Sequence, residues 1–170
     1  IFWASRPGVA GADYSAKPST LDHKALAQRV AEESMVLLKN EGAVLPADPA
    51  SVNRILLVGP LAEADNLGDA ASSKVDPESI VTIRAGITEQ YADAEINYMV
   101  DGDAQALKSA ASAADLVIAV VGYGSADEGE NIQVFGERDP NEPTWGTGGD
   151  RTDLRLKRED VAHLQLLSGA

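Results

Sequence analysis

Residues 54–59 read RILLVG, and no polar residue interrupts this short run between Ile55 and Val58. Such a run is typical of a strand buried on both faces of a parallel sheet, because a half-exposed strand alternates apolar and polar residues. Residues 116–121, LVIAVV, are uncharged and rich in β-branched side chains, and residues 95–100, EINYMV, also have strand character. These three segments are therefore predicted to be strands.

Helical segments lie between the predicted strands and after them. Residues 82–91 and the alanine-rich residues 103–114 separate the strands, and residues 158–168 have the spacing of an amphipathic helix. Alternating strands and helices with short links predict βαβ units, whose right-handed crossovers place helices on both faces of the sheet. The predicted fold is thus an α/β three-layer sandwich with a mostly parallel sheet.

The N-terminal part of the chain predicts an arm and a further helix. Residues 1–20 contain prolines and glycines without an apolar period, and we expect them to be an irregular arm from a preceding domain. From Leu21 apolar residues recur at helical spacing, and this helix is expected to end at Gly42, which can adopt a left-handed conformation. We expect residues 21–170 to form the sandwich domain, truncated at its C-terminus and therefore incomplete in this chain.

The composition excludes several classes of function. The 170 residues include 27 acidic and 14 basic side chains, which give a formal charge of −13, and no cysteine. Without cysteine, a disulfide scaffold, a thiolate zinc site and a cysteine nucleophile are impossible. The negative charge repels phosphates, so no nucleic-acid partner is predicted. No apolar run reaches the roughly 18 residues of a membrane span, so none is predicted.

The acidic residues gather in a glycine-rich segment, residues 122–151, that follows the last predicted strand. Ligands of open parallel sheets bind beyond the carboxyl ends of the strands, so this segment is expected to be functional. Its motif Asp127-Glu128-Gly129-Glu130 could supply a general acid, because neighbouring carboxylates or an apolar wall raise the pKa of a carboxyl group. Tyr123, Phe135 and Trp145 could supply that wall or a flat face for a sugar ring.

Other site chemistries have weaker support. Residues 139–142 lack the alternating acids of an EF-hand, which leaves only a calcium loop of another type as an alternative. Gly122 and Gly124 form a G-x-G pair, but Asp127 occupies the third glycine position of a dinucleotide fingerprint, and the loop acids would repel a pyrophosphate. We therefore predict neither a cofactor nor a metal.

Several motifs along the chain resemble those of a known family. Residues 31–42, AEESMVLLKNEG, with Leu45 and Pro46, resemble the opening of the second domain of family-3 glycoside hydrolases, the β-glucosidase group. The segments that continue the resemblance are 55–62, the loop elements 66–69 and 72–75, the strand 114–122, the acidic motif 127–130, and 149–151. The similarity extends over about residues 20–168.

The resemblance implies a retaining glycosidase that acts on terminal β-linked glucosyl or related residues. Its active site would lie between a TIM-barrel domain, which supplies an aspartate nucleophile, and this sandwich domain. Glu128 is the expected acid/base residue and Glu130 is the runner-up. Carbohydrate is the expected substrate, and its expected contacts are Asp69, Ser72, Ser73, Tyr123 and Trp145.

The expected partner of this chain is the remainder of the same enzyme. Because no barrel is present, and hence no nucleophile, we expect this fragment to be inactive by itself. An alternative is a non-catalytic α/β module that binds carbohydrate or packs against a catalytic partner. A response-regulator-like acceptor domain is a third class, but it needs paired acids at the end of the first strand, where Gly59 and Pro60 stand instead.

Overall fold

The computed structural model describes four parts of the chain, which are residues 20–68, 75–124, 127 and 155–169. The chain divides into two compact units, residues 1–46 and 47–170, and each is described by itself. The expected domain division after residue 20 stays a prediction.

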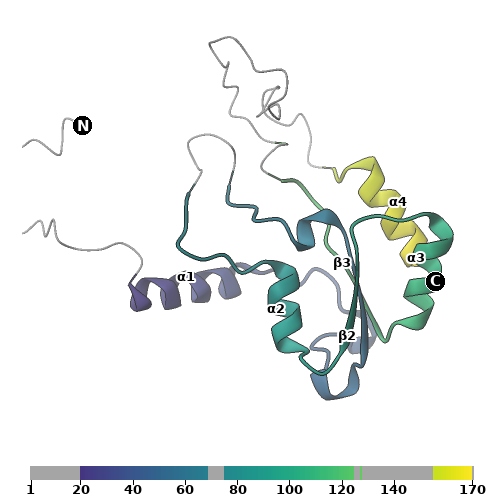
Figure 1. Cartoon of the computed structure of the whole chain (residues 1–170), viewed down its shortest axis with the longest axis horizontal. Coiled ribbons are helices and arrows are strands. Elements are labelled where there is room, and N and C mark those ends of the chain that lie inside the picture. Colours follow the sequence, from purple (N-terminus) through teal and green to yellow (C-terminus); the bar gives the residue numbers. More distant parts are fainter. Residues whose placement is uncertain (1–19, 69–74, 125–126, 128–154, 170) are drawn as a thin grey trace, which may run out of the picture. The chain divides into compact units, whose positions relative to one another are not determined.

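The second unit contains a parallel three-stranded sheet in the order β2-β1-β3 (Figure 1). The strands are β1 (Arg54–Val58), β2 (Glu95–Met99) and β3 (Leu116–Ala119). Central β1 is parallel to both neighbours, and Leu56 pairs with Asn97 on one side and Val117 on the other. The predicted strands and their parallel arrangement are confirmed.

Helices lie on both sides of this sheet (Figure 1). They are α2 (Ile83–Gln90) on one side, and α3 (Ala104–Ala113) and α4 (Arg158–Leu167) on the other. Four consecutive residues of β1, from Ile55 to Val58, are at most 1% exposed. Because successive strand residues point to opposite faces, both faces of β1 are covered, as the RILLVG pattern predicts.

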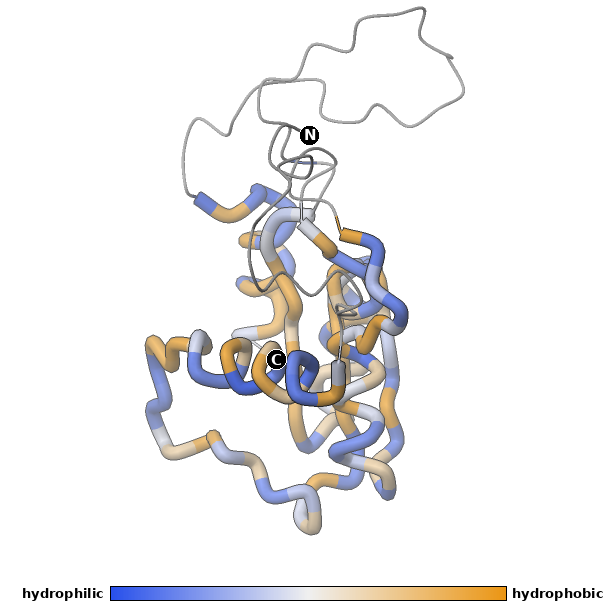
Figure 2. The backbone as a smooth tube through the Cα atoms, turned by 90° about the vertical axis from the view of Figure 1, so that its left-hand side faces the viewer, coloured by the Kyte–Doolittle hydropathy of each residue, from blue (hydrophilic) through white to orange (hydrophobic). Residues whose placement is uncertain are grey.

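The core on the α3 side is formed by Leu56 and Val58 of β1 and by Leu107 and Ala111 of α3. The partly buried Leu166 and Leu167 of α4 pack against the same cluster. Hydrophobic and hydrophilic stretches alternate along the helical segments (Figure 2), which is the pattern of helices that bury one face. Through these leucines α4 packs against α3 and the core cluster.

Side-chain caps begin two of the helices where the sequence places their starts. The Thr82 hydroxyl accepts a hydrogen bond from the Ala85 N–H (3.1 Å) at the start of α2. The Asp103 carboxylate accepts one from the Ala106 N–H (2.8 Å) at the start of α3. Each cap pairs a donor that the first turn of a helix leaves without an intrahelical partner.

The first unit contains α1 (Leu21–Ser34), which is shorter than the sequence predicts. The chain leaves the helix at Met35, whose φ and ψ are −71° and 133°. The Ser34 hydroxyl donates to the Ala31 carbonyl (2.8 Å), and such local bonds compete with the helical ladder. The predicted continuation to Gly42 is wrong, although Gly42 does have a left-handed φ of 77°.

Short 3-10 turns connect the other elements. They are η1 (Glu41–Ala43), η2 (Pro49–Ser51) and η3 (Pro60–Ala62). The Asn40 side chain closes the turn around η1, since its amide donates to the Leu45 carbonyl (2.8 Å) and its carbonyl accepts from the Leu45 N–H (3.0 Å). This closed loop explains why residues 40–45 do not extend the preceding helix.

Candidate functional site

The three strands end beside one another at the carboxyl edge of the sheet. The Gly59 N–H donates to the Met99 carbonyl (2.9 Å), and the Val120 N–H donates to the Val58 carbonyl (2.8 Å). Gly59 has a φ of 112°, and a Cβ atom there would lie 2.2 Å from the Val120 carbonyl oxygen. Only glycine fits this position, because the backbone of Val120, directly after β3, passes too close for any side chain.

A cavity of about 420 Å³ opens at this carboxyl edge. Its lining comes from all three strand exits and from the first half of α4: Pro60, Leu61, Val100, Asp101, Val120, Gly122, Gly124, Asp127, Lys157, Glu159, Asp160 and His163. Its position agrees with the general rule that ligands of open parallel sheets bind beyond the carboxyl ends of the strands.

The segment that leaves β3 is held by the start of α4. The Lys157 ammonium lies 2.7 Å from the Asp127 carboxylate, and the same oxygen, Oδ2, accepts a hydrogen bond from the Gly124 N–H (2.8 Å). Asp160 of α4 is only 9% exposed, and its carboxylate accepts from the Gly122 N–H (3.2 Å). Two acidic side chains thus bind backbone N–H groups of residues 122–124.

Tyr123 is the predicted site residue that the described part of the chain contains. Its ring lies under the Lys157 ammonium, which is 5.5 Å from the ring centroid. Its hydroxyl donates to the Arg155 carbonyl. Tyr123 therefore borders the Asp127–Lys157 pair, and its expected contact with a sugar stays a prediction.

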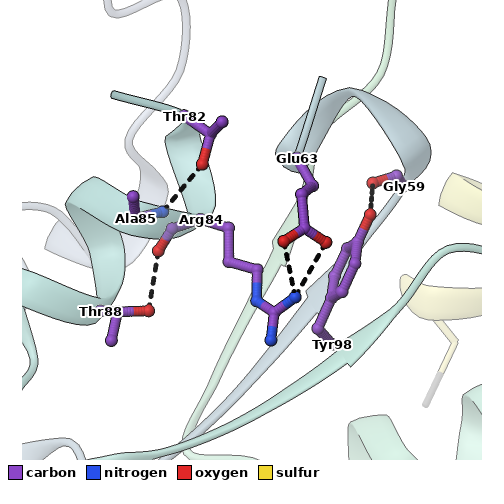
Figure 3. Close-up of polar contacts among 7 residues, drawn as sticks. All are labelled: Gly59, Glu63, Thr82, Arg84, Ala85, Thr88 and Tyr98. Carbon is purple, nitrogen blue, oxygen red and sulfur yellow. Dashed lines mark hydrogen bonds and ion pairs between the residues drawn. The ribbon is translucent and has the colours of Figure 1, made fainter. Parts of the chain in front are cut away.

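A second polar cluster lies beside the exits of β1 and β2 (Figure 3). Arg84, near the start of α2, places one guanidinium nitrogen 2.9 Å and 2.8 Å from the two carboxylate oxygens of Glu63. The same guanidinium lies 4.8 Å from the centroid of the Tyr98 ring, and the Tyr98 hydroxyl donates to the Gly59 carbonyl (3.3 Å). This cluster joins both ends of the loop between η3 and α2 to the sheet.

A hydrogen bond joins the loops that leave β1 and β3. The side-chain amide of Asn66 donates to the Tyr123 carbonyl at 3.5 Å. The first loop leads to Asp69, Ser72 and Ser73, and the second leads to Glu128, Glu130 and Trp145. All six of these predicted site residues lie outside the described residues, so their expected roles stay predictions.

The opposite, amino edge of the sheet has a charged contact of a different kind. The Asp115 carboxylate accepts hydrogen bonds from the Asn53 N–H (3.0 Å) and the Arg54 N–H (2.9 Å). These bonds, first that of Asn53 and then that of Arg54, hold the pKa of Asp115 below its ordinary value. This contact joins the starts of β1 and β3, away from the cavity.

Sequence reasoning missed Lys157, Asp160, Glu63 and Arg84. Acidic residues in the first turn of a helix are common, so Asp160 gives no specific signal in the sequence. The partner of Lys157 lies 30 positions away, across a segment without periodicity.

Within the described ranges no three His, Asp or Glu side chains are arranged to hold a metal ion. Nor does any helix there have the length and apolarity that crossing a membrane requires.

The fold and the cavity define an α/β domain with a polar site at the carboxyl edge of its parallel sheet. The model of the glycosyl hydrolase family 3 C-terminal domain matches residues 35–169. The chain belongs to this family, which confirms the resemblance seen in its sequence.

Individual relatives agree with this assignment. A β-xylosidase of Formosa agariphila is 25% identical over 84% of this chain and 21% of its own length. A stretch of 56 residues, 33% of this chain, is 45% identical to β-glucosidase 1 of Saccharomycopsis fibuligera and covers 6% of that protein. The chain thus spans about a fifth, or less, of the curated relatives that it matches.

Solved structures share the fold. The β-D-glucoside glucohydrolase of Trichoderma reesei superposes with a TM-score of 0.67 at 23% identity, over 88% of this chain and 22% of that one. The β-glucosidase EmGH1 of Erythrobacter marinus gives a TM-score of 0.65 at 27% identity, with the same coverage. The predicted α/β sandwich is therefore confirmed.

Proposed function

We propose that this chain is part of a retaining glycosidase that cleaves terminal β-linked glucosyl or related residues. The chain would contribute the acid/base loop and the loops that border the sugar. The observation that carries the proposal is the cavity at the carboxyl edge, whose wall includes Asp127, the residue directly before Glu128. The names of the relatives, β-glucosidases and a β-xylosidase, support the substrate class.

The proposed reaction uses two carboxyl groups on opposite sides of the glycosidic bond. An aspartate of a barrel domain outside this chain attacks the anomeric carbon, and Glu128 gives its proton to the leaving oxygen. The leaving alcohol departs, and a covalent glycosyl-enzyme forms. Glu128, now a carboxylate, takes a proton from water, which attacks the same carbon and releases the sugar with its configuration retained. Retention requires the two carboxyl groups to lie about 5–5.5 Å apart.

The sugar-binding role is assigned to the two loops that leave β1 and β3. Asp69, Ser72 and Ser73 would hydrogen-bond sugar hydroxyls, while Tyr123 and Trp145 would offer aromatic faces to a sugar ring. The hydrogen bond between Asn66 and Tyr123 supports this proposal, since it joins the loop before Asp69 to the segment before Glu128.

Kinetics of the complete enzyme test the proposal. Glu128→Gln is expected to lower kcat/KM strongly on substrates with poor leaving groups, such as alkyl glucosides, and far less on dinitrophenyl glucoside, whose departure needs no proton. Glu130→Gln is the matched control, because it changes a neighbouring carboxylate in the same way. If Glu130→Gln alone shows this pattern, the runner-up is the acid/base residue.

Two results would contradict the proposal. Unchanged activity and an unchanged pH profile in both variants would remove the acid/base role from this chain and favour the non-catalytic module. Hydrolysis of glucosides by the isolated 170-residue chain would contradict the assignment of the nucleophile to another domain.

A further inference from the structure

We propose that the cavity at the carboxyl edge of the sheet binds the sugar residue that departs as the leaving group, and that Asp101, Glu159 and His163 determine which leaving groups it accepts. This inference rests on the proposed function, because it assumes that this chain gives the proton to the leaving oxygen. It assigns a role to three described residues that neither the sequence motifs nor the family resemblance indicates.

Three polar side chains of the cavity lining are available to a ligand. Asp101 lies at the exit of β2, and Glu159 and His163 lie four positions apart in α4, which places them on the same side of the helix. Within the described ranges none of the three makes a hydrogen bond or an ion pair through its side chain. The carboxylates can accept hydrogen bonds from hydroxyl groups, and a neutral imidazole can both donate and accept one.

The same cavity has an apolar part. Leu61 comes from η3, and Val100 and Val120 directly follow β2 and β3. A Cβ atom at Gly122 would lie 3.6 Å from Leu61 Cδ1, and one at Gly124 would lie 3.5 Å from Leu61 Cδ2, so Leu61 lies along the segment that leaves β3. A pyranose ring has apolar C–H faces and hydroxyl groups around its edge, and it therefore fits a site that combines apolar walls with a few polar groups.

The size and the charge of the cavity agree with an uncharged sugar. Its volume of about 420 Å³ lies within the range of about 300–1,000 Å³ that is typical of small-molecule sites. Acidic groups outnumber basic ones in the described lining, where the carboxylates belong to Asp101, Asp127, Glu159 and Asp160 and the ammonium belongs to Lys157. This excess of negative charge repels carboxylate, phosphate and sulfate groups of a ligand and favours hydroxyl groups, which donate hydrogen bonds to carboxylates.

The proposed reaction assigns the bound sugar to the leaving group. The nucleophile attacks the anomeric carbon from the side opposite the leaving group, whereas the acid gives its proton on the side of the leaving group. In the proposed function the nucleophile belongs to a domain outside this chain, and the acid belongs to this chain. A sugar-binding cavity in this chain is therefore expected to contact the leaving group.

The first test compares two substrates of the complete enzyme, the best-cleaved β-linked glucose disaccharide and methyl β-glucoside. Only the disaccharide has a leaving-group sugar. Asp101→Ala and His163→Ala should each lower the ratio of kcat/KM for the disaccharide to kcat/KM for methyl β-glucoside about five-fold, since each removes a hydrogen bond to that sugar. Asp93→Ala is the matched control, because Asp93 is exposed in the turn at the opposite end of β2, and its ratio should be unchanged.

The second test reverses the sign of the effect. A disaccharide whose leaving sugar is a uronic acid keeps the ring and adds one carboxylate, and Asp101→Asn/Glu159→Gln removes two carboxylates from the cavity lining. This double variant should raise kcat/KM for the uronic acid disaccharide about five-fold relative to the neutral disaccharide, because it removes repulsion. The gain should shrink in about 1 M salt, where the screening length is about 3 Å. Poor folding of the variant cannot produce such a gain.

The inference and the proposed function fail in different ways. The inference is wrong and the proposed function stands if Glu128→Gln or Glu130→Gln lowers kcat/KM on alkyl glucosides, while Asp101→Ala and His163→Ala leave the substrate ratio unchanged and the double variant does not favour the uronic acid disaccharide. If neither glutamate variant lowers kcat/KM, the proposed function is wrong and the inference falls with it.

Discussion

Replacement of Gly59 by alanine is expected to loosen the carboxyl edge of the sheet. The added Cβ would lie 2.2 Å from the Val120 carbonyl oxygen, about 1.2 Å short of the 3.4 Å at which ordinary contact begins. The φ of 112° at Gly59 adds strain for any L side chain, about 1–3 kcal/mol. Moving Val120 away would weaken its 2.8 Å hydrogen bond to Val58, which contributes about 1 kcal/mol. The expected loss is about 3 kcal/mol.

Hydrogen exchange measured by mass spectrometry on the complete enzyme can localise this loss. A decrease of about 3 kcal/mol in the free energy of opening corresponds to exchange roughly 100-fold faster in peptides that contain β1 and β3. The matched control is Gly86→Ala in α2, where the added Cβ meets no atom within 4 Å. That variant should be more stable by about 0.5–1 kcal/mol, because alanine favours a helix.

One result would refute the reasoning about Gly59. If Gly59→Ala leaves the exchange of both strands as slow as in the unchanged protein, the close approach of β1 and β3 at this edge is wrong. The positions of Pro60 and Val120 in the wall of the cavity, which follow from this close approach, would then be wrong as well.

Three further predictions concern stability. Leu107→Ala removes a side chain that is 0% exposed, and should destabilise the domain by about 2–5 kcal/mol, measured by the same exchange experiment on α3 and β1. Asp103→Ala removes the cap of α3 and should cost about 1 kcal/mol, whereas Asp103→Ser should restore most of it. The pKa of Asp115 in the folded protein is below its ordinary value of 3.8. Its contribution to the free energy of unfolding is therefore fully present above pH 3.8, and it is lost as the pH falls through the pKa of the folded state. A melting curve recorded at several pH values should therefore show a weaker acid dependence for Asp115→Asn, and an unchanged dependence would contradict the assignment.

The sheet and the helices around it could be predicted because local signals agree there. The uncharged run from Ile55 to Val58 requires burial on both faces, and Thr82 and Asp103 provide caps where the helical pattern begins. The end of α1 could not be predicted in this way. Its apolar spacing continues past Ser34, but the side-chain bonds of Ser34 and Asn40 favour other backbone conformations.

The candidate site depends on contacts between residues far apart in the sequence, which local patterns do not encode. Lys157 lies beside Asp127 only because α4 packs against the core and the sheet directs the segment after β3 toward its start. The acidic motif 127–130 stands out in the sequence because it follows the last predicted strand, and Asp127 does line the cavity at the carboxyl edge of the sheet. The specific reaction is implied by the family resemblance, because the spacing of the acidic residues in that motif does not by itself indicate one.

Azide rescue in the complete enzyme tests the central proposal most directly. With Glu128→Ala, or with Glu130→Ala if the runner-up is correct, azide should restore turnover on an activated β-glucoside and give a β-glucosyl azide, because the small anion enters the space left by the acid/base carboxylate. If neither variant responds to azide and both give only the ordinary hydrolysis product, this chain does not supply the acid/base residue.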